Sequence, residues 1–439
     1  MPTPAFSTDL YQLTMMAGYF TQDMLPVRAT FELFVRRLPR NRAFLVAAGL
    51  DQALDYLEGL TFSAGEIDWL RNHPAFQRVA PAFFDYLGSF RFSGDVWAMR
   101  EGTPFFPMEP ILRVSAPIAE AQLVETALLA IMTFQTTIAS KAIRIVHAAG
   151  DRPVMEFGAR RAHGLEAALF GARAAYLAGC VGTSLVEAGR TFGIPLSGTM
   201  AHSWILAAAS EAEAFTSYAE LFDQRTVLLL DTFDVNAAAT MAIDAGLRPQ
   251  GVRIDSGDLA ATSRSVRDLL DRAGLASTRI IASGDLDEWK IADLVAVEAP
   301  VDTFAVGTAL ATSDDAPALG GVYKLVELED RGVVRKVMKR SEGKGTWPGA
   351  KQVWRLENGG VAIGDLIALD DEAPPPRSAR PLLEQAVRNG ARITSQPSLE
   401  EARQHCRRAT EDLPSRLRSL AADASYPVER SAALARLSQ

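Results

Sequence analysis

The sequence predicts an α/β fold built around a parallel sheet, either open or closed into a barrel. After residue 150, short apolar strands alternate with helices. Successive strands start roughly 23 to 28 residues apart, which is the length of a βα unit. Polar residues also follow these strands at the points where they end. Together the three observations favour parallel strands with one shared, polar edge.

Five such units can be read in order along the centre of the chain. They begin at "RPVMEFGARRAHG", "RTVLLLDTFD", "GVRIDSGDL", "TRIIASGDLDEW" and "VDTFAVGTALA". In each unit a short apolar run is followed by a small polar turn and then by helical apolar spacing. We expect each run to be a strand of the sheet.

The flanking segments have a different pattern. "TDLYQLTMMAGYF" has a Thr or Asp cap and helical spacing, and "RATFELFVRRL" alternates like a half-buried strand. A long helix is expected roughly from Ala119 to His147. Residues 320 to about 370 are strand-rich, and the Arg-rich tail that follows predicts a solvated surface helix.

The composition excludes several classes of protein. The 439 residues carry a formal net charge of −8, so no basic excess exists for nucleic acid as the main partner. The two cysteines, Cys180 and Cys406, lie far apart and predict neither a disulfide framework nor a metal site. We read no signal peptide and no run of 18 apolar residues, so we expect a cytoplasmic protein without a membrane span.

The strand ends carry the residue types that bind phosphate and sugar. Arginines form bidentate hydrogen bonds with carboxylates and phosphates. A Gly-Thr turn can hold a phosphate, and carboxylates can hold Mg²⁺ through water. One aspartate alone could be a helix cap, but in parallel α/β folds ligands collect where the strands end. These side chains therefore predict a shared mouth for a phosphorylated, sugar-like substrate: Arg160, Arg161, Asp231, Asp234, Arg253, Asp255, Asp258, Asp285, Gly307 and Thr308.

One histidine raises a separate question. His202 is one of five histidines and lies in "GTMAHSW", just past the strand-like "IPLSG". From the residues alone, it is either a packed core histidine or a group presented to a ligand.

The motifs as a set resemble the nicotinate phosphoribosyltransferase family over nearly the whole chain. They are "TDLYQLTMM", "EFGARRAHG", "GTSLVEAGRTFGIPLSGTMAHSW", "LLLDTFD", "GVRIDSGDL", "SGDLDEW", "FAVGTALATSDDAPALGGVYKLVE" and "LLEQAVRNG". The resemblance implies an ATP-coupled pentosyltransferase, also classed as a ligase. It would convert nicotinate and 5-phosphoribosyl pyrophosphate (PRPP) to nicotinate mononucleotide and pyrophosphate, in NAD salvage.

The same resemblance implies an irregular TIM-like α/β barrel beside a second, α+β domain built from both ends of the chain. We expect the α+β domain at residues 1–118, completed by part of 320–439. The barrel is expected at 119–320, and a strand-rich return segment with a helical tail at 321–439. The family's usual homodimer is head-to-tail, with each site completed by the other subunit.

Catalytic roles follow from the matched motifs. His202 matches the histidine that ATP phosphorylates, with Mg²⁺ offsetting charge during transfer. Asp255 and Asp285 resemble carboxylates that engage the ribose hydroxyls and, as metal-associated groups, the Mg²⁺–pyrophosphate. Gly307 and Thr308 resemble the 5′-phosphate loop. For Asp231 two roles remain open, a carboxylate role similar to that of Asp255 and Asp285, or a helix cap.

Base-binding roles follow in the same way. Phe157 matches an aromatic that stacks on the pyridine ring, and Tyr11 matches the aromatic on its opposite face, supplied by the partner subunit. Arg160 and Arg253 resemble arginines near the nicotinate carboxylate and the phosphates, whereas Arg161 could equally form a surface salt bridge. Ser184 stands where the nicotinamide-using relative carries an Asp, which would repel a carboxylate.

The resemblance has departures and alternatives. Gly284 and Asp285 stand where many members carry Asn then Asp, and Ala305 where a Gly is frequent. Nicotinamide phosphoribosyltransferase is the first alternative, and Ser184 argues against it. The quinolinate-using relative needs a more basic pocket and lacks the coupled histidine. A non-catalytic nucleotide-binding module and a structural scaffold are further alternatives from other classes.

Overall fold

The computed structural model describes residues 4–340, 345–376, 378–393, 397–420 and 425–437. The chain divides into two compact units, one formed by Met1–Thr137 with Ala318–Gln439 and the other by Ile138–Pro317. The first boundary falls inside a long helix, whereas the sequence analysis places it before Ala119. The unit of residues 138–317 carries the strand ends that the sequence singled out.

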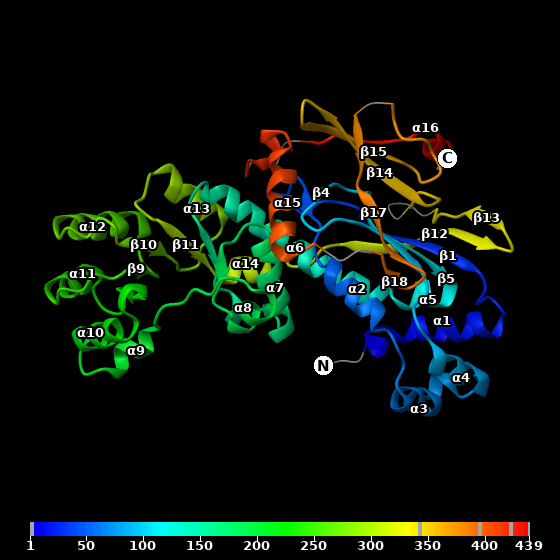
Figure 1. The fold of residues 1–439 in the computed structure, drawn as a ribbon, viewed down its shortest axis with the longest axis horizontal. Helices are drawn as coiled ribbons and strands as arrows, with labels where there is room; N and C mark the ends of the chain where they lie inside the picture. Colours follow the sequence, from blue (N-terminus) through cyan, green and yellow to red (C-terminus); the bar gives the residue numbers. More distant parts are fainter. Residues whose placement is uncertain (1–3, 341–344, 377, 394–396, 421–424, 438–439) are drawn as a thin grey trace. The chain divides into compact units, whose positions relative to one another are not determined.

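A six-stranded parallel sheet forms the centre of residues 138–317 (Figure 1). Its spatial order is β7-β6-β11-β10-β9-β8, and every pairing is parallel. The strands are β6 (Val154–Glu156), β7 (Gly182–Thr183), β8 (Val227–Leu229), β9 (Gly251–Ile254), β10 (Arg279–Ala282) and β11 (Thr303–Val306). All five predicted strands are confirmed, and the sheet is a half barrel with β7 and β8 at its edges.

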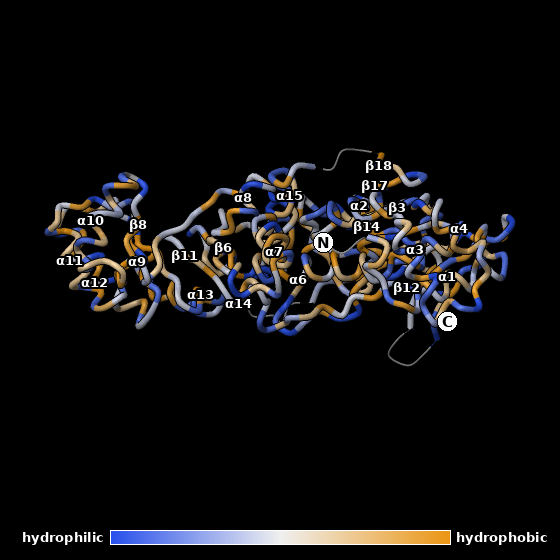
Figure 2. The backbone as a smooth tube through the Cα atoms, turned by 90° about the horizontal axis from the view of Figure 1, so that it is seen from below, coloured by the Kyte–Doolittle hydropathy of each residue, from blue (hydrophilic) through white to orange (hydrophobic). Residues whose placement is uncertain are grey.

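Helices follow the strands as predicted. They are α7 (Leu165–Leu177), α8 (Val186–Phe192), α9 (His202–Ala207), α10 (Glu211–Phe222), α11 (Val235–Asp244), α12 (Leu259–Arg272), α13 (Glu288–Ala296) and α14 (Thr308–Thr312). In α12, Val266 and Leu270 are buried among charged neighbours, and hydrophobic and hydrophilic segments alternate along this region in Figure 2. Asp234 and Asp258 accept from backbone N–H groups in the first turns of α11 and α12. These two strand-end aspartates are helix caps, and neither is among the residues that line the pocket at the strand ends.

The segment before His202 differs from the prediction. "IPLSG" is not a strand, because it makes one isolated bridge from Leu196 to Thr183. The backbone of Thr183 bonds to Pro195 and Ser197 across this bridge. The missed strand is β7, whose two residues are too few to leave an alternating pattern in the sequence.

The long helix predicted from Ala119 to His147 is present as two pieces, α5 (Ile118–Leu123) and α6 (Glu125–Ala149). Among the described residues, α6 alone is long and apolar enough to cross a membrane, by length and composition. Of its most apolar window, 67% is buried inside the protein. A buried core helix explains that composition.

The other unit is built on three sheets, in which every pair of neighbouring strands is antiparallel except β15 with β19. Its seven-stranded sheet has the order β13-β12-β1-β5-β3-β17-β18, its four-stranded sheet has the order β16-β14-β15-β19, and β2 and β4 form a two-stranded sheet. The strands are β1 (Arg28–Val35), β2 (Leu45–Val46), β3 (Asp95–Met99), β4 (Pro104–Phe105), β5 (Pro110–Pro117), β12 (Gly321–Asp330), β13 (Val333–Lys336), β14 (Lys351–Asn358), β15 (Val361–Leu369), β16 (Ala379–Pro381), β17 (Leu383–Arg388), β18 (Ala391–Arg392) and β19 (Val428–Arg430). Its helices are α1 (Leu10–Thr21), α2 (Leu50–Glu58), α3 (Ala64–Asn72), α4 (Pro81–Ser89), α15 (Leu399–Glu411) and α16 (Ala432–Leu437).

Two expectations for this unit are corrected. Strand β1 is buried on both faces, because every residue from Ala29 to Val35 is buried, including Glu32, whose carboxylate pairs with buried Lys351. The tail is not a solvated helix, since α15 buries Ala402, Cys406 and Ala409 against the unit and β19 adds a strand. Neither Cys180 nor Cys406 forms a disulfide, and both are buried. Helix α1 forms as predicted, with Asp9 as its N-cap.

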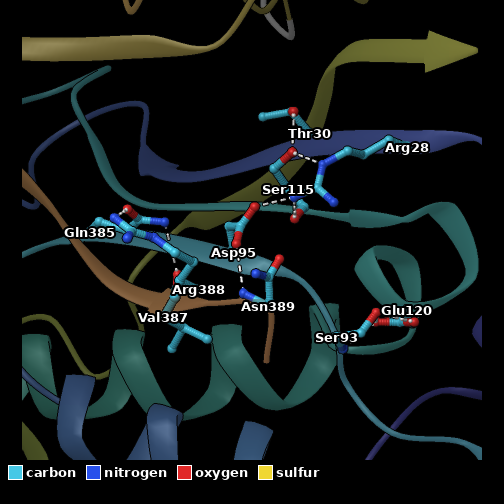
Figure 3. A network of polar contacts seen from close by, with 10 residues as sticks. All are labelled: Arg28, Thr30, Ser93, Asp95, Ser115, Glu120, Gln385, Val387, Arg388 and Asn389. Atoms are coloured by element: carbon cyan, nitrogen blue, oxygen red, sulfur yellow. Dashed lines mark hydrogen bonds and ion pairs between the residues drawn. The ribbon is translucent and has the colours of Figure 1, made fainter. Parts of the chain in front are cut away.

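Polar side chains tie the strands of the seven-stranded sheet together (Figure 3). Arg28 on β1 donates from Nε to Ser115 Oγ on β5 at 3.1 Å and pairs with Asp95 on β3. Asp95 in turn accepts from the backbone N–H of Asn389 at 2.8 Å, after β17. These contacts link four strands that come from distant parts of the chain.

Candidate active site

The carboxyl ends of the parallel strands surround a pocket of about 580 Å³. Because the strands run in one direction, the residues that follow β7, β6, β11, β10 and β9 reach the same edge of the sheet. The pocket brings together nine residues singled out from the sequence: Phe157, Arg160, Arg161, Ser184, Arg253, Asp255, Asp285, Gly307 and Thr308.

An ion pair fixes the centre of the pocket. Arg253, on β9, donates to Asp255 Oδ1 at 2.8 Å, and its Nε donates to Ser283 Oγ at 2.8 Å. Ser283 also donates to Asp255 Oδ1, so the three side chains form a closed network. Both charged side chains are largely shielded, which strengthens the pair and holds the guanidinium in one orientation.

Ser283 is a pocket residue that the sequence analysis missed. It directly follows β10 in "IIASGD", where only Asp285 was singled out. The rule that was applied to the aspartates, a polar side chain directly after a strand, applies equally to this serine. The loop from Gly198 to Ala201 also lines the pocket and was quoted only for its histidine.

Gly284 allows two strand ends to approach each other closely. Its φ is +93°, and a Cβ at this position would lie 2.0 Å from the carbonyl oxygen of Asp255. Only glycine fits such a backbone, because any Cβ would collide with that carbonyl oxygen. The next residue, Asp285, also has positive φ, at 49°, and its exposed side chain is in the pocket lining.

The turn after β6 carries Phe157 and Arg160. The backbone N–H of Phe157 donates to Val306 O at 2.8 Å, and the ring centroid lies 6.0 Å from Arg253 Cζ. Phe157 is half-buried and lines the pocket, so plain core packing does not describe it. Arg160 and Arg161 belong to a short 3-10 turn, Ala159–Arg161, and are exposed at the pocket.

Ser184 lies on the opposite side of β6 from the Gly307–Thr308 turn. It directly follows β7, its side chain is exposed to the pocket, and its backbone N–H donates to Glu156 O at 3.1 Å. Gly307 and Thr308 follow β11, next in the sheet on the other side of β6. The order of the strands therefore places Phe157 between the residues predicted to select the base and those predicted to hold phosphate.

His202 is next to the pocket lining and is not part of it. It is the first residue of α9, directly after Ala201, which lines the pocket. Its Nδ1 lies 3.1 Å from Thr232 Oγ1, in the turn that follows β8. The half-buried imidazole is thus held by a neighbouring strand end through one nitrogen.

Asp231 supports the backbone of the site. Its Oδ2 accepts from the backbone N–H of Asp255 at 3.2 Å and from Ser256 Oγ at 2.6 Å. The cap of the following helix is Asp234, so the helix-cap interpretation of Asp231 is wrong. Its Oδ1 is buried and has no hydrogen-bond partner within the described part of the chain.

The pocket carboxylates of Asp255 and Asp285 can bind Mg²⁺ only together with substrate phosphates and water. Among the described residues, no group of three or more His, Cys, Asp or Glu side chains is arranged to hold a metal. Asp255 Oδ1 is committed to Arg253 and Ser283, which leaves its second oxygen and the exposed Asp285. Such a sparse set suits Mg²⁺ that is bound mainly by substrate phosphates and water.

Tyr11 belongs to the other unit. It is 48% exposed on α1, and its hydroxyl donates to Glu125 Oε2 at 3.1 Å. Partial burial and the negative charge of Glu125 raise its pKa to about 12. The hydroxyl therefore stays protonated at neutral pH. Its hydrogen bond to Glu125 holds the hydroxyl end of the ring, while nearly half of the side chain remains exposed.

A pocket at the ends of parallel strands, with arginines, carboxylates and a glycine–threonine turn, defines an α/β enzyme that handles an anionic ligand. Three family models match in order along the chain. The nicotinate phosphoribosyltransferase N-terminal domain matches residues 6–133, the nicotinate phosphoribosyltransferase family model residues 153–341, and the C-terminal domain residues 375–438. The chain belongs to the nicotinate phosphoribosyltransferase family.

Individual relatives agree with this assignment. The chain is 44% identical to nicotinate phosphoribosyltransferase pncB2 of Mycobacterium tuberculosis, over 97% of this chain and 91% of that protein. It is 43% identical to nicotinate phosphoribosyltransferase of Bacillus subtilis, over 83% and 76% of the two chains. The crystal structure of human nicotinic acid phosphoribosyltransferase superposes with a TM-score of 0.84 at 29% identity, covering 98% of each chain.

A second solved structure has a different printed name. Nicotinate-nucleotide pyrophosphorylase from Pyrococcus furiosus superposes with a TM-score of 0.75 at 27% identity, covering 93% of this chain and 95% of that one. Both names concern nicotinate or its nucleotide, so the fold similarity extends across enzymes of pyridine nucleotides.

The close approach at Gly284 yields a prediction about stability. Gly284→Ala is expected to lower the free energy of unfolding by about 1–2 kcal/mol for the left-handed backbone, and by about 1–3 kcal/mol more for overpacking against Asp255. The matched control is Gly257→Ala, where φ is +80° but no atom lies within 4 Å of the added carbon. Urea unfolding of both variants measures the difference, and equal destabilisation would contradict the close approach.

Proposed function

We propose that the chain transfers the phosphoribosyl group of PRPP to nicotinate, in NAD salvage in the cytoplasm, with ATP hydrolysis coupled to the reaction. The observation that carries this proposal is the pocket, which combines Ser184, Phe157 and Arg253 with the Gly307–Thr308 turn in one cavity. The names of the relatives support the choice of nicotinate as the base.

The base is expected to bind between Phe157 and the Ser184 turn. The Phe157 ring would stack on the pyridine ring, worth about 0.5–1.5 kcal/mol beyond the area buried. The Ser184 hydroxyl would donate to the nicotinate carboxylate, and the Arg160 and Arg253 guanidinium groups would offset its charge. Arg253 is already fixed by Asp255 and Ser283, so little side-chain entropy is lost when the base binds.

PRPP is expected to extend from this base site toward the phosphate turn. Backbone N–H groups at Gly307 and Thr308 would hold the 5′-phosphate, while Asp255 and Asp285 would engage the ribose hydroxyls and Mg²⁺–pyrophosphate. Mg²⁺, when bound, supplies positive charge that stabilises the leaving pyrophosphate. The pyridine nitrogen attacks C1′, the C1′–O bond breaks, and pyrophosphate leaves with the bonding electrons. Nearby carboxylates stabilise the positive charge that develops at C1′.

His202 is expected to couple ATP to this reaction. Thr232 contacts Nδ1, so an Nδ1–H that donates to Thr232 leaves the lone pair on Nε2. Nε2 would attack the γ-phosphorus of ATP, ADP would leave, and water would later hydrolyse the phosphohistidine. This hydrolysis would drive the equilibrium toward nicotinate mononucleotide.

The site is expected to be completed by a second copy of the chain. In the proposed head-to-tail homodimer, Tyr11 of the partner subunit would cover the free face of the pyridine ring. The fixed hydroxyl and exposed ring of Tyr11 support this role.

The direct test is turnover by the purified protein. PRPP and Mg²⁺ are supplied with nicotinate, nicotinamide or quinolinate, each with and without ATP, and the mononucleotide is followed by chromatography. We expect nicotinate mononucleotide, formed faster with ATP. Product from quinolinate alone would assign the other phosphoribosyltransferase class, and nucleotide binding without product from any base would assign a non-catalytic module.

The coupling role predicts a specific defect. His202→Ala is expected to fold normally and to form product slowly, with no ATP hydrolysed per product, because the phosphorylated nitrogen is gone. Counting ADP and nicotinate mononucleotide in the same reaction measures the ratio. His73→Ala, in the other unit and not among the residues that line the pocket, is the matched control. A folded His202→Ala enzyme with unchanged ADP per product would contradict the role.

The base selector predicts a change in preference. Ser184→Asp is expected to lower the ratio of kcat/KM for nicotinate to that for nicotinamide by about tenfold or more, or about 1.4 kcal/mol. A carboxylate there repels the nicotinate carboxylate and accepts from the amide NH₂ of nicotinamide. Ser184→Asn has nearly the same shape without the charge and is the matched control. An unchanged ratio in Ser184→Asp would remove Ser184 as the selector.

A further inference from the structure

A buried carboxylate that the proposed reaction does not use lies directly beneath the base site. Glu156 is the last residue of β6 and is 3% exposed. It precedes Phe157 but is not itself among the residues that line the pocket at the strand ends, and burial raises the pKa of its carboxyl group. A carboxylate in such a place is costly unless each oxygen has a specific partner.

Both oxygens have such partners, and the partners belong to two different turns. One oxygen accepts from the backbone N–H of Gly158, and the other accepts from Thr183 Oγ1 at 2.6 Å. The same Thr183 hydroxyl accepts from the backbone N–H of Leu185 at 3.0 Å. A chain of hydrogen bonds therefore runs from the turn after β6 to the turn after β7.

These two turns carry the groups that are expected to hold the base. The first contains Phe157 and Arg160, and the second contains Ser184 between the two bonded residues Thr183 and Leu185. Strand β7 has only two residues, so its ladder fixes the second turn weakly. The first turn is also confined, because a Cβ on Gly158 would lie 2.4 Å from Ala311 Cβ.

We propose that Glu156 and Thr183 form a positioning pair, which sets the separation of Ser184 from Phe157 and thereby the affinity for the pyridine base. This inference rests on the proposed function, because it assigns the pyridine base to these two turns. Neither residue touches the base. The pair acts by holding the two turns at a fixed spacing, since a small shift of either turn separates the groups that bind the ring and its carboxylate.

The test removes one hydroxyl and compares two substrates. Thr183→Val keeps the shape of the side chain but leaves an oxygen of Glu156 without its donor. We expect KM for nicotinate to rise about tenfold, while kcat and KM for PRPP stay within about twofold. Thr183→Ser keeps the hydroxyl and is expected to restore the KM for nicotinate.

The matched control is Thr278→Val. Thr278 is 3% exposed and donates to Pro249 O at 3.0 Å. It lies just before β10, at the amino-terminal ends of the parallel strands, whereas the pocket lies at their carboxyl ends. This variant loses a buried hydroxyl bond of the same kind, and we expect both KM values to stay unchanged. If KM for nicotinate rises as much in Thr278→Val as in Thr183→Val, the rise follows from the loss of any buried hydroxyl bond. That result would overturn the positioning role of Glu156 and Thr183.

A second variant covers the case in which Thr183→Val does not fold. In Glu156→Met no side-chain oxygen remains to accept from Gly158 or from Thr183, so the same selective rise in KM is expected. The double variant is expected to show no further rise, because both changes break one chain of bonds. An unchanged KM for nicotinate in a folded variant overturns the inference, as does loss of folding in both. A wild-type protein that makes no nicotinate mononucleotide overturns the proposed function instead.

Discussion

The six strands of the parallel sheet end at one edge, and the whole pocket depends on that shared direction. Ser184, Phe157, Gly307, Ser283 and Asp255 come from positions spread over more than a hundred residues of sequence, yet each follows the last residue of a neighbouring strand. A single reversed strand would move one of these groups to the opposite edge. The arrangement therefore provides several binding groups without any long loop to order.

The charged side chains at the carboxyl ends of the strands suit an anionic substrate, although the protein as a whole is acidic. The chain has a net charge of −8, but three arginines and two aspartates line the pocket. The Arg253–Asp255–Ser283 network places opposite charges side by side at the pocket lining. Fixed groups of this kind need little reorganisation when charge develops during the reaction.

Much of this was predictable, and the failures have physical causes. The five βα units follow from hydrophobic periodicity, and the strand-end rule found seven lining residues, while Phe157 and Ser184 were found through the family resemblance. The same rule overcounted Asp234 and Asp258, because capping a helix requires the same residue type at the same place. Strand β7 was missed because two residues carry no period. The contacts of Glu156, Ser283 and Thr232 depend on tertiary neighbours that no local pattern encodes.

We propose that the strand-end pocket binds nicotinate and the phosphoribosyl group in one continuous site. A crystal structure of the protein with nicotinate mononucleotide tests this proposal directly. We expect the pyridine ring against Phe157, its carboxylate within hydrogen-bond distance of Ser184, and the 5′-phosphate at Gly307 and Thr308. A nucleotide bound elsewhere, such as in the groove lined by Asn236, Met241 and Leu269 on α11 and α12, would contradict it.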